Sequence, residues 1–109
     1  MGVALVTSGP GATNLITGIA TSWFDSIPVL YITGQQARSR LRGDLKVRQI
    51  GFQETPIVEI VRPITKYAIT VMEPEHVIPV LSAALSIAKI ARFGPVLVDI
   101  PDDIQRAMI

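Results

Sequence analysis

The sequence has 109 residues, of which 49% are hydrophobic and 17% charged, and its ten basic and nine acidic residues give a net charge of +1. This length allows a single domain with one modest core, and the composition is too apolar for a disordered segment. The near-neutral charge gives no electrostatic case for nucleic acid or an anionic membrane, and the lack of cysteine excludes disulfides, thiolate zinc sites and cysteine nucleophiles.

The first third of the chain alternates short apolar runs with a longer helical stripe, which indicates parallel strands joined by crossover helices. Residues 3–6 form an unbroken apolar run, which predicts a strand inside a sheet that is covered on both faces. Residues 12–25 carry apolar side chains at helical spacings and predict one amphipathic helix. Residues 29–33 predict a second buried strand, which Gly34 ends.

The middle of the chain contains its most polar stretch, residues 35–49, with five basic side chains. We interpret this stretch as a long surface loop that is solvated or faces another subunit. Thr55 and Pro56 then predict the N-cap and the first residue of a short helix that ends near Pro63.

The last third of the chain completes an α/β pattern. Alternating polar and apolar side chains over residues 66–71 predict an edge strand. Residues 73–88 predict a helix, and residues 96–100 predict a third buried strand followed by an acidic turn at residues 101–103. The sequence therefore predicts one α/β domain over residues 1–109, with an open, mostly parallel sheet, flanking helices and at least one exposed sheet edge.

The most informative local feature is the turn Thr-Ser-Gly-Pro-Gly-Ala-Thr-Asn at residues 7–14, between a predicted strand and a predicted helix. Ligands of open α/β sheets bind at the carboxyl ends of strands, where glycines allow close backbone approach. The alternative is a tight turn in which glycine and proline only set backbone angles. The turn lacks the spacing of a dinucleotide fingerprint or a P-loop, so a phosphate cradle is not supported.

A second candidate feature is the segment Gly-Phe-Gln-Glu-Thr at residues 51–55, just before a predicted helix. The amide of Gln53 can donate and accept hydrogen bonds at a ligand while Phe52 forms a wall. The alternative is that Phe52 fills the core and Gln53 faces water. Glu54 and Glu59 are five residues apart, which makes them a poor general acid and base pair.

Other polar residues favour structural roles. His76 begins a predicted helix and is expected at the surface or as a cap, while Asp102 and Asp103 are expected in a solvated turn without a third metal ligand. We therefore expect no metal site. No apolar run approaches the roughly 20 residues that a membrane-spanning helix needs, so we expect no membrane partner. The lack of cysteine permits a reducing compartment and the N-terminus shows no basic region followed by an apolar leader core, so we expect a cytoplasmic location.

Taken in order, several segments resemble the N-terminal, pyrimidine-binding domain of acetolactate-synthase-like thiamine-diphosphate enzymes. The resemblance covers almost the whole chain, and the ordered series is specific to this superfamily. It implies a homo-oligomer whose active site lies between subunits. The segments that carry it are residues 7–14, Asp25-Ser26-Ile27-Pro28, Ile32-Thr33-Gly34-Gln35, Phe52-Gln53-Glu54, Thr65-Lys66 and the Gly-Pro-Val-Leu-Val-Asp-Ile-Pro run at residues 94–101.

The resemblance also implies a cofactor, a reaction and site residues. Another domain or subunit would hold the diphosphate and Mg²⁺, and the reaction would be decarboxylation or carboligation of a small 2-oxo acid by transketolase-type carbon–carbon bond chemistry. Gln53 would face the reacting centre as a catalytic residue. The residues implied to hold the aminopyrimidine of thiamine diphosphate are Ser8, Gly9, Pro10, Gly11, Asn14 and Gln53.

Two departures from the family pattern set the remaining expectations. The family's catalytic glutamate belongs to an earlier strand and helix that residues 1–109 do not contain, so the chain is expected to be an incomplete domain and inactive alone. Neither Glu54 nor Glu59 is expected to replace that glutamate. Residues 35–52 are longer and more basic than in typical acetolactate synthases, and this region touches flavin or substrate in the family. FAD, the second candidate cofactor, and the identity of the 2-oxo acid are therefore both left open by the resemblance.

Two other functions are consistent with the same residues. The chain could be a non-catalytic interaction module that pairs with a full-length relative. It could also be an unrelated flavodoxin-like domain that binds a nucleotide at the turn around Gly9. Binding of a nucleotide without binding of thiamine diphosphate would favour the second of these.

Overall fold

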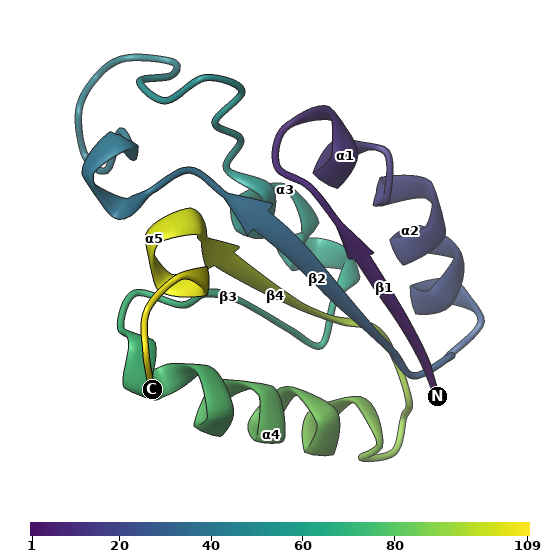
Figure 1. The fold of residues 1–109 in the computed structure, drawn as a ribbon. Helices are drawn as coiled ribbons and strands as arrows, with labels where there is room; N and C mark the ends of the chain where they lie inside the picture. Colours follow the sequence, from purple (N-terminus) through teal and green to yellow (C-terminus); the bar gives the residue numbers. More distant parts are fainter.

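The computed structural model describes residues 1–109. The chain folds into a sheet of four parallel strands with helices on both faces (Figure 1). The strand order is β1-β2-β4-β3, and every neighbouring pair is parallel. This arrangement confirms the predicted α/β fold with an open, mostly parallel sheet. The strands are β1 (Gly2–Val6), β2 (Val29–Gln35), β3 (Tyr67–Thr70) and β4 (Val96–Pro101).

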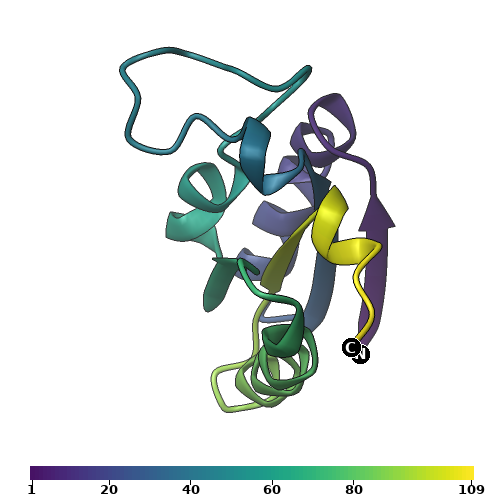
Figure 2. The ribbon, with the colours of Figure 1, turned by 60° about the vertical axis from the view of Figure 1, so that its left-hand side comes forward.

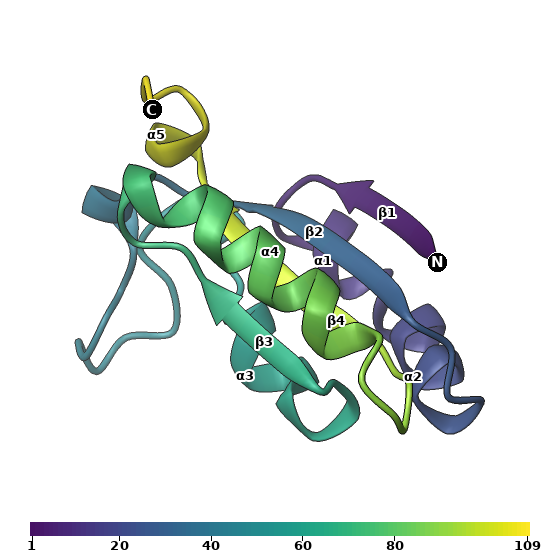
Figure 3. The same ribbon diagram turned by 90° about the horizontal axis from the view of Figure 1, so that it is seen from below.

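The helices are divided between the two faces of the sheet. The short helices α1 (Pro10–Thr13), α2 (Ile16–Phe24) and α3 (Ile57–Val61) cover one face, and α4 (Val77–Ala88) covers the other (Figure 1, Figure 3). Helix α5 (Asp102–Gln105) follows β4 at its carboxyl end. None of these helices is long and apolar enough to cross a membrane.

Two apolar clusters fill the space between the sheet and these helix layers. Alternation along β4 sends Val96 and Val98 to the cluster under α4, while Leu97 joins the cluster under α1, α2 and α3. All three side chains are fully buried, as expected for a central parallel strand with both faces covered. The predicted buried strand at residues 96–100 is confirmed.

Strand β1 differs from its prediction. It lies at one edge of the sheet, and its Val3 and Leu5 side chains are 64% and 74% exposed. Ala4 packs with the cluster under α1 and α2, whereas α4 packs on β2, β3 and β4. The prediction of an interior strand covered on both faces is therefore wrong, because an unbroken apolar run indicates burial but cannot reveal which strand lies at an edge.

Three smaller predictions also need correction. The single helix predicted for residues 12–25 is two helices, because the Leu15 amide bonds to the carbonyl of Ala12 and tightens the chain between α1 and α2. Pro56 is the N-cap of α3, and the Thr55 hydroxyl donates to the Gln53 carbonyl instead of capping the helix. The acidic turn at residues 101–103 begins helix α5, where carboxylates suit the amino-terminal turn.

The polar segment that follows β2, residues 36–49, forms the predicted surface loop, which we call the polar loop. Figure 2 shows it projecting beyond the carboxyl ends of the strands. Its only regular element is a 3-10 turn at Arg38–Arg40. The loop therefore borders the end of the sheet at which ligands of open α/β folds bind.

Candidate functional site

The turn after β1 and the segment after the polar loop meet at the carboxyl end of the sheet. Gly9 has φ 61°, and a Cβ atom at Gly9 would lie 2.7 Å from the Cβ of Gln53 and 2.8 Å from its carbonyl oxygen. Gln53 itself has φ 58°. The fold thus brings together the two features that the sequence marked separately.

Packing within the protein explains both glycines of the turn. The positive φ and the contact with Gln53 exclude a side chain at Gly9. A Cβ at Gly11 would lie 2.7 Å from the Cγ2 atom of Thr7. The presence of these glycines therefore does not by itself indicate a ligand, and the case for one depends on the polar groups around them.

The other predicted site residues lie around this turn with different exposure. Ser8 is half-buried, and its Oγ accepts a long hydrogen bond from Gln36 Nε2 at 3.5 Å. Pro10 is the first residue of α1, and Asn14 is exposed at the carboxyl end of that helix. Gln53 is exposed. Phe52 is 78% exposed, so the alternative in which it fills the core is wrong.

A buried carboxylate that sequence reasoning did not single out lies beneath this site. Asp99 Oδ1 accepts a hydrogen bond from Thr33 Oγ1 at 2.7 Å, and its Oδ2 accepts from Gln35 Nε2 at 3.0 Å and Thr70 Oγ1 at 3.1 Å. Thr33, Asp99 and Thr70 are register partners on β2, β4 and β3. Their polar character inside apolar strands was the available signal, but only the strand order brings them together.

Burial raises the pKa of the Asp99 carboxyl above its ordinary value of 3.8, and hydrogen bonds from Thr33, Gln35 and Thr70 oppose the rise. A raised folded-state pKa adds stability that is fully present below the unfolded pKa and is lost as the pH rises through the folded pKa. Asp99→Asn removes this titration. We expect the unfolding free energy of the parent, relative to this variant, to fall in urea titrations as the pH rises from about 4 through the raised folded-state pKa of Asp99. A difference in unfolding free energy between parent and variant that does not change with pH would contradict the raised pKa of Asp99.

Glu54 anchors the polar loop to the segment at residues 51–55 that contains Gln53. Its carboxylate is nearly buried and accepts hydrogen bonds from the backbone amides of Arg42 at 2.7 Å and Ile50 at 2.9 Å. The Glu59 carboxylate instead lies 3.7 Å from Arg42 Nη2. The two glutamates therefore bind the loop separately, which agrees with their rejection as an acid and base pair.

A charged pair holds the start of the loop to helix α5. Arg38 Nε donates to Asp103 Oδ2 at 2.7 Å, and the Arg38 amide donates to Asp103 Oδ1 at 3.0 Å. These hydrogen bonds lower the pKa of the Asp103 carboxyl. The Asp102 Oδ1 atom lies 3.1 Å from Arg106 Nη2. Both carboxylates are thus partly exposed to solvent, as expected, but each is also paired with an arginine. Nowhere in residues 1–109 do three or more histidine, cysteine or acidic side chains gather as metal ligands would.

The two largest of four cavities show where a small molecule could enter. A polar hollow of about 520 Å³ lies at the carboxyl ends of the strands and includes Thr7, Ser8, Gln35 and Gln36 in its lining. A larger cavity of about 610 Å³ lies between α3 and β3, away from the turn.

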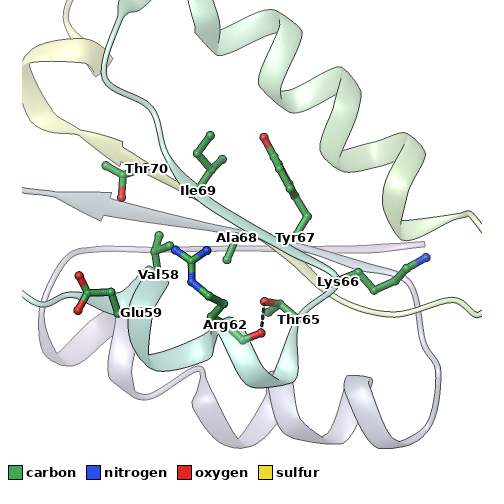
Figure 4. Close-up of a pocket in the computed structure, with 9 residues that line it drawn as sticks. All are labelled: Val58, Glu59, Arg62, Thr65, Lys66, Tyr67, Ala68, Ile69 and Thr70. Atoms are coloured by element: carbon green, nitrogen blue, oxygen red, sulfur yellow. Dashed lines mark hydrogen bonds between the residues drawn. The ribbon is translucent and has the colours of Figure 1, made fainter.

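Figure 4 shows that larger cavity, with Glu59 and Arg62 on the α3 side. Lys66 points toward α4, where its Nζ donates to the carbonyl of Ile87 (Figure 4). None of the candidate site residues lines this cavity. The polar hollow, although smaller, is lined by Ser8 and therefore lies beside the candidate site.

Comparison with known proteins gives a consistent result. Residues 1–60 match the family described as thiamine pyrophosphate enzyme, N-terminal TPP binding domain. The chain is 49% identical over 109 residues to acetolactate synthase of Arthrospira platensis and 46% identical over 108 residues to chloroplastic acetolactate synthase 2 of Nicotiana tabacum. These alignments cover 100% and 99% of the chain but 18% and 15% of the relatives. Since the family match spans more than half of its residues, the chain belongs to the thiamine pyrophosphate enzymes and carries sequence of their N-terminal TPP-binding domain.

Proposed function

We propose that this chain supplies the pyrimidine-binding half of a thiamine-diphosphate site in an acetolactate-synthase-like enzyme that decarboxylates and ligates 2-oxo acids. The observation that carries the proposal is the contact between the Gly9 turn and Gln53 at the carboxyl end of a parallel sheet. Membership of the thiamine pyrophosphate enzymes supports thiamine diphosphate as the ligand at this contact. The proposed pyrimidine-binding residues are Ser8, Gly9, Pro10, Gly11, Asn14 and Gln53.

The groups at the turn suit an aminopyrimidine. This ring presents an amino donor and ring-nitrogen acceptors, and the Gln53 amide can complement both because it donates and accepts. Ser8 Oγ and the backbone of the turn add further polar groups beside the hollow. Thiamine diphosphate, when bound, supplies a nucleophilic carbon that adds to a 2-oxo acid and permits loss of carbon dioxide. Gln53 would orient the ring at that centre.

Other parts of the proposed enzyme would complete the site. The described residues contain no cluster suited to Mg²⁺, so a diphosphate-binding domain or a second subunit would hold the metal and the diphosphate. The polar loop beside the site is the proposed contact for a 2-oxo acid or FAD. The tobacco relative is named as chloroplastic. A cytoplasmic location for this chain therefore stays a prediction.

The test is a chimeric enzyme, defined as the Arthrospira platensis acetolactate synthase in which residues 1–109 replace the aligned segment. We expect this chimera to bind thiamine diphosphate with Mg²⁺ and to convert a 2-oxo acid. Calorimetric titration measures binding, and release of carbon dioxide measures turnover. A folded chimera that does not bind the cofactor would contradict the proposal.

The alternative of a non-catalytic interaction module makes a different prediction. It expects the chain to associate with a full-length acetolactate synthase and change its activity, while the chimera binds cofactor weakly and does not turn over. The unrelated flavodoxin-like alternative is not retained, because the family match covers the turn itself.

A further inference from the structure

We infer that Gln35 and Asp99 form a positioning pair that holds Gln53 against the Gly9 turn. This inference rests on the proposed function, because it assigns the pair a role in presenting Gln53 to the cofactor. Neither residue reaches Gln53 directly. They act through the backbone at Thr55, two residues further along the chain.

The hydrogen bonds of Gln35 define this connection. Its side-chain nitrogen donates to the Thr55 carbonyl at 2.7 Å and to Asp99 Oδ2 at 3.0 Å, and its side-chain oxygen accepts from the Gln36 amide at 3.0 Å. These three bonds fix which end of the Gln35 amide faces the Thr55 carbonyl. An ionised Asp99 carboxylate has acceptors and no donor, so it binds the donating end of the Gln35 amide.

The segment that Gln35 holds is under backbone strain. Gln53 has φ 58°, a conformation that side-chain-bearing residues keep only where surrounding contacts enforce it. The Thr55 hydroxyl donates to the Gln53 carbonyl at 3.3 Å, so the anchored Thr55 is linked to the strained residue. The same carbonyl faces Gly9. Release of Thr55 would therefore let Gln53 leave the turn.

The burial of Asp99 argues against a role that is only structural, because burying a carboxylate costs stability. A carboxylate placed in the interior loses hydration, and apolar side chains of similar size would fill the same space without that cost. Asp99 is 1% exposed and stands among valine and leucine residues of β4. Orientation of a hydrogen-bonding neighbour is a function that an apolar residue could not supply.

The test compares two variants of the chimeric enzyme that each deprive Asp99 of one hydrogen bond. Gln35→Met removes the link to Thr55, whereas Thr33→Val removes the bond to Asp99 Oδ1 and leaves Gln35 in place. We expect the melting temperature to fall further in Gln35→Met, which loses three hydrogen bonds, than in Thr33→Val, which loses one. We expect the affinity for thiamine diphosphate to fall roughly 10-fold or more in Gln35→Met but to stay within about twofold in Thr33→Val.

A conservative variant supplies the positive control. In Asp99→Asn, the amide oxygen can accept from Gln35 and Thr70 while the amide nitrogen donates to the Thr33 hydroxyl. We expect this variant to keep its cofactor affinity, and Asp99→Ala to lose it as Gln35→Met does. If Gln35→Met does not assemble, Gln35→Asn is used, because its shorter amide cannot reach both partners.

The outcomes separate this inference from the proposed function. Equal affinity losses in Gln35→Met and Thr33→Val, or equal losses in Asp99→Asn and Asp99→Ala, would overturn the positioning role while the parent chimera still binds cofactor. A parent chimera that folds without binding cofactor would overturn the proposed function and the inference together. A selective loss in the Gln35 variant, with retention in Asp99→Asn, supports the inference.

Discussion

Gly9→Ala is expected to abolish measurable binding of thiamine diphosphate by the chimeric enzyme and to lower its unfolding free energy by about 2–5 kcal/mol. The new methyl group would lie 2.7 Å from the Cβ of Gln53 at a backbone φ of 61°. Either the turn or Gln53 must therefore move. Urea unfolding measures the stability, and calorimetric titration measures the cofactor affinity.

Gly43→Ala is the matched control for this substitution. Gly43 also has a positive φ, of 53°, but a Cβ there would have no neighbouring atom within 4 Å. Its backbone strain should cost about 1 kcal/mol, with little change in cofactor affinity. Equal affinities for Gly9→Ala and the parent would show that the contact between the turn and Gln53 does not form the site.

Gln53→Gly is expected to separate stability from activity. Glycine accepts the φ of 58° without strain, and this gain offsets the entropy that glycine loses on folding, so stability should be unchanged or up to about 1 kcal/mol higher. Loss of the amide should reduce turnover of a 2-oxo acid by the chimera about 100-fold, in the range found when one polar group at a reacting centre is removed. Unfolding and steady-state kinetics on the same preparations measure both effects.

Ser26→Gly provides the comparison for Gln53→Gly. Ser26 is the other non-glycine residue with a positive φ, of 57°, and it lies between α2 and β2, before the strand runs to the candidate site. Its replacement should change stability in the same direction while turnover stays at the parent level. A parental turnover rate in Gln53→Gly would remove Gln53 from the catalytic centre.

The sheet and the site turn could be predicted from sequence because their signals are local. Runs of apolar residues marked the buried strands at β2 and β4, and the glycine-rich turn at residues 7–14 marked the carboxyl end of β1. The resemblance then joined this turn to Gln53. These signals depend on neighbouring residues or on an ordered series of motifs, and neither requires knowledge of the strand order.

The positions of β1 and Asp99 could not be predicted because they depend on strand order. An apolar run predicts burial, yet β1 is an edge strand with an exposed face. Asp99 appears in the sequence as a polar residue inside a buried strand, and its partners Thr33 and Thr70 are 66 and 29 residues away. Only the order β1-β2-β4-β3 places these side chains together beneath the site.

The most direct test of the proposed site is a crystal structure of the chimeric enzyme with thiamine diphosphate and Mg²⁺. We expect the aminopyrimidine to lie against the turn at residues 8–11, with the Gln53 amide at about 3 Å from a polar atom of the ring. We expect the metal and the diphosphate to contact residues outside this chain. A bound cofactor whose pyrimidine contacts neither the turn nor Gln53 would contradict the proposed site.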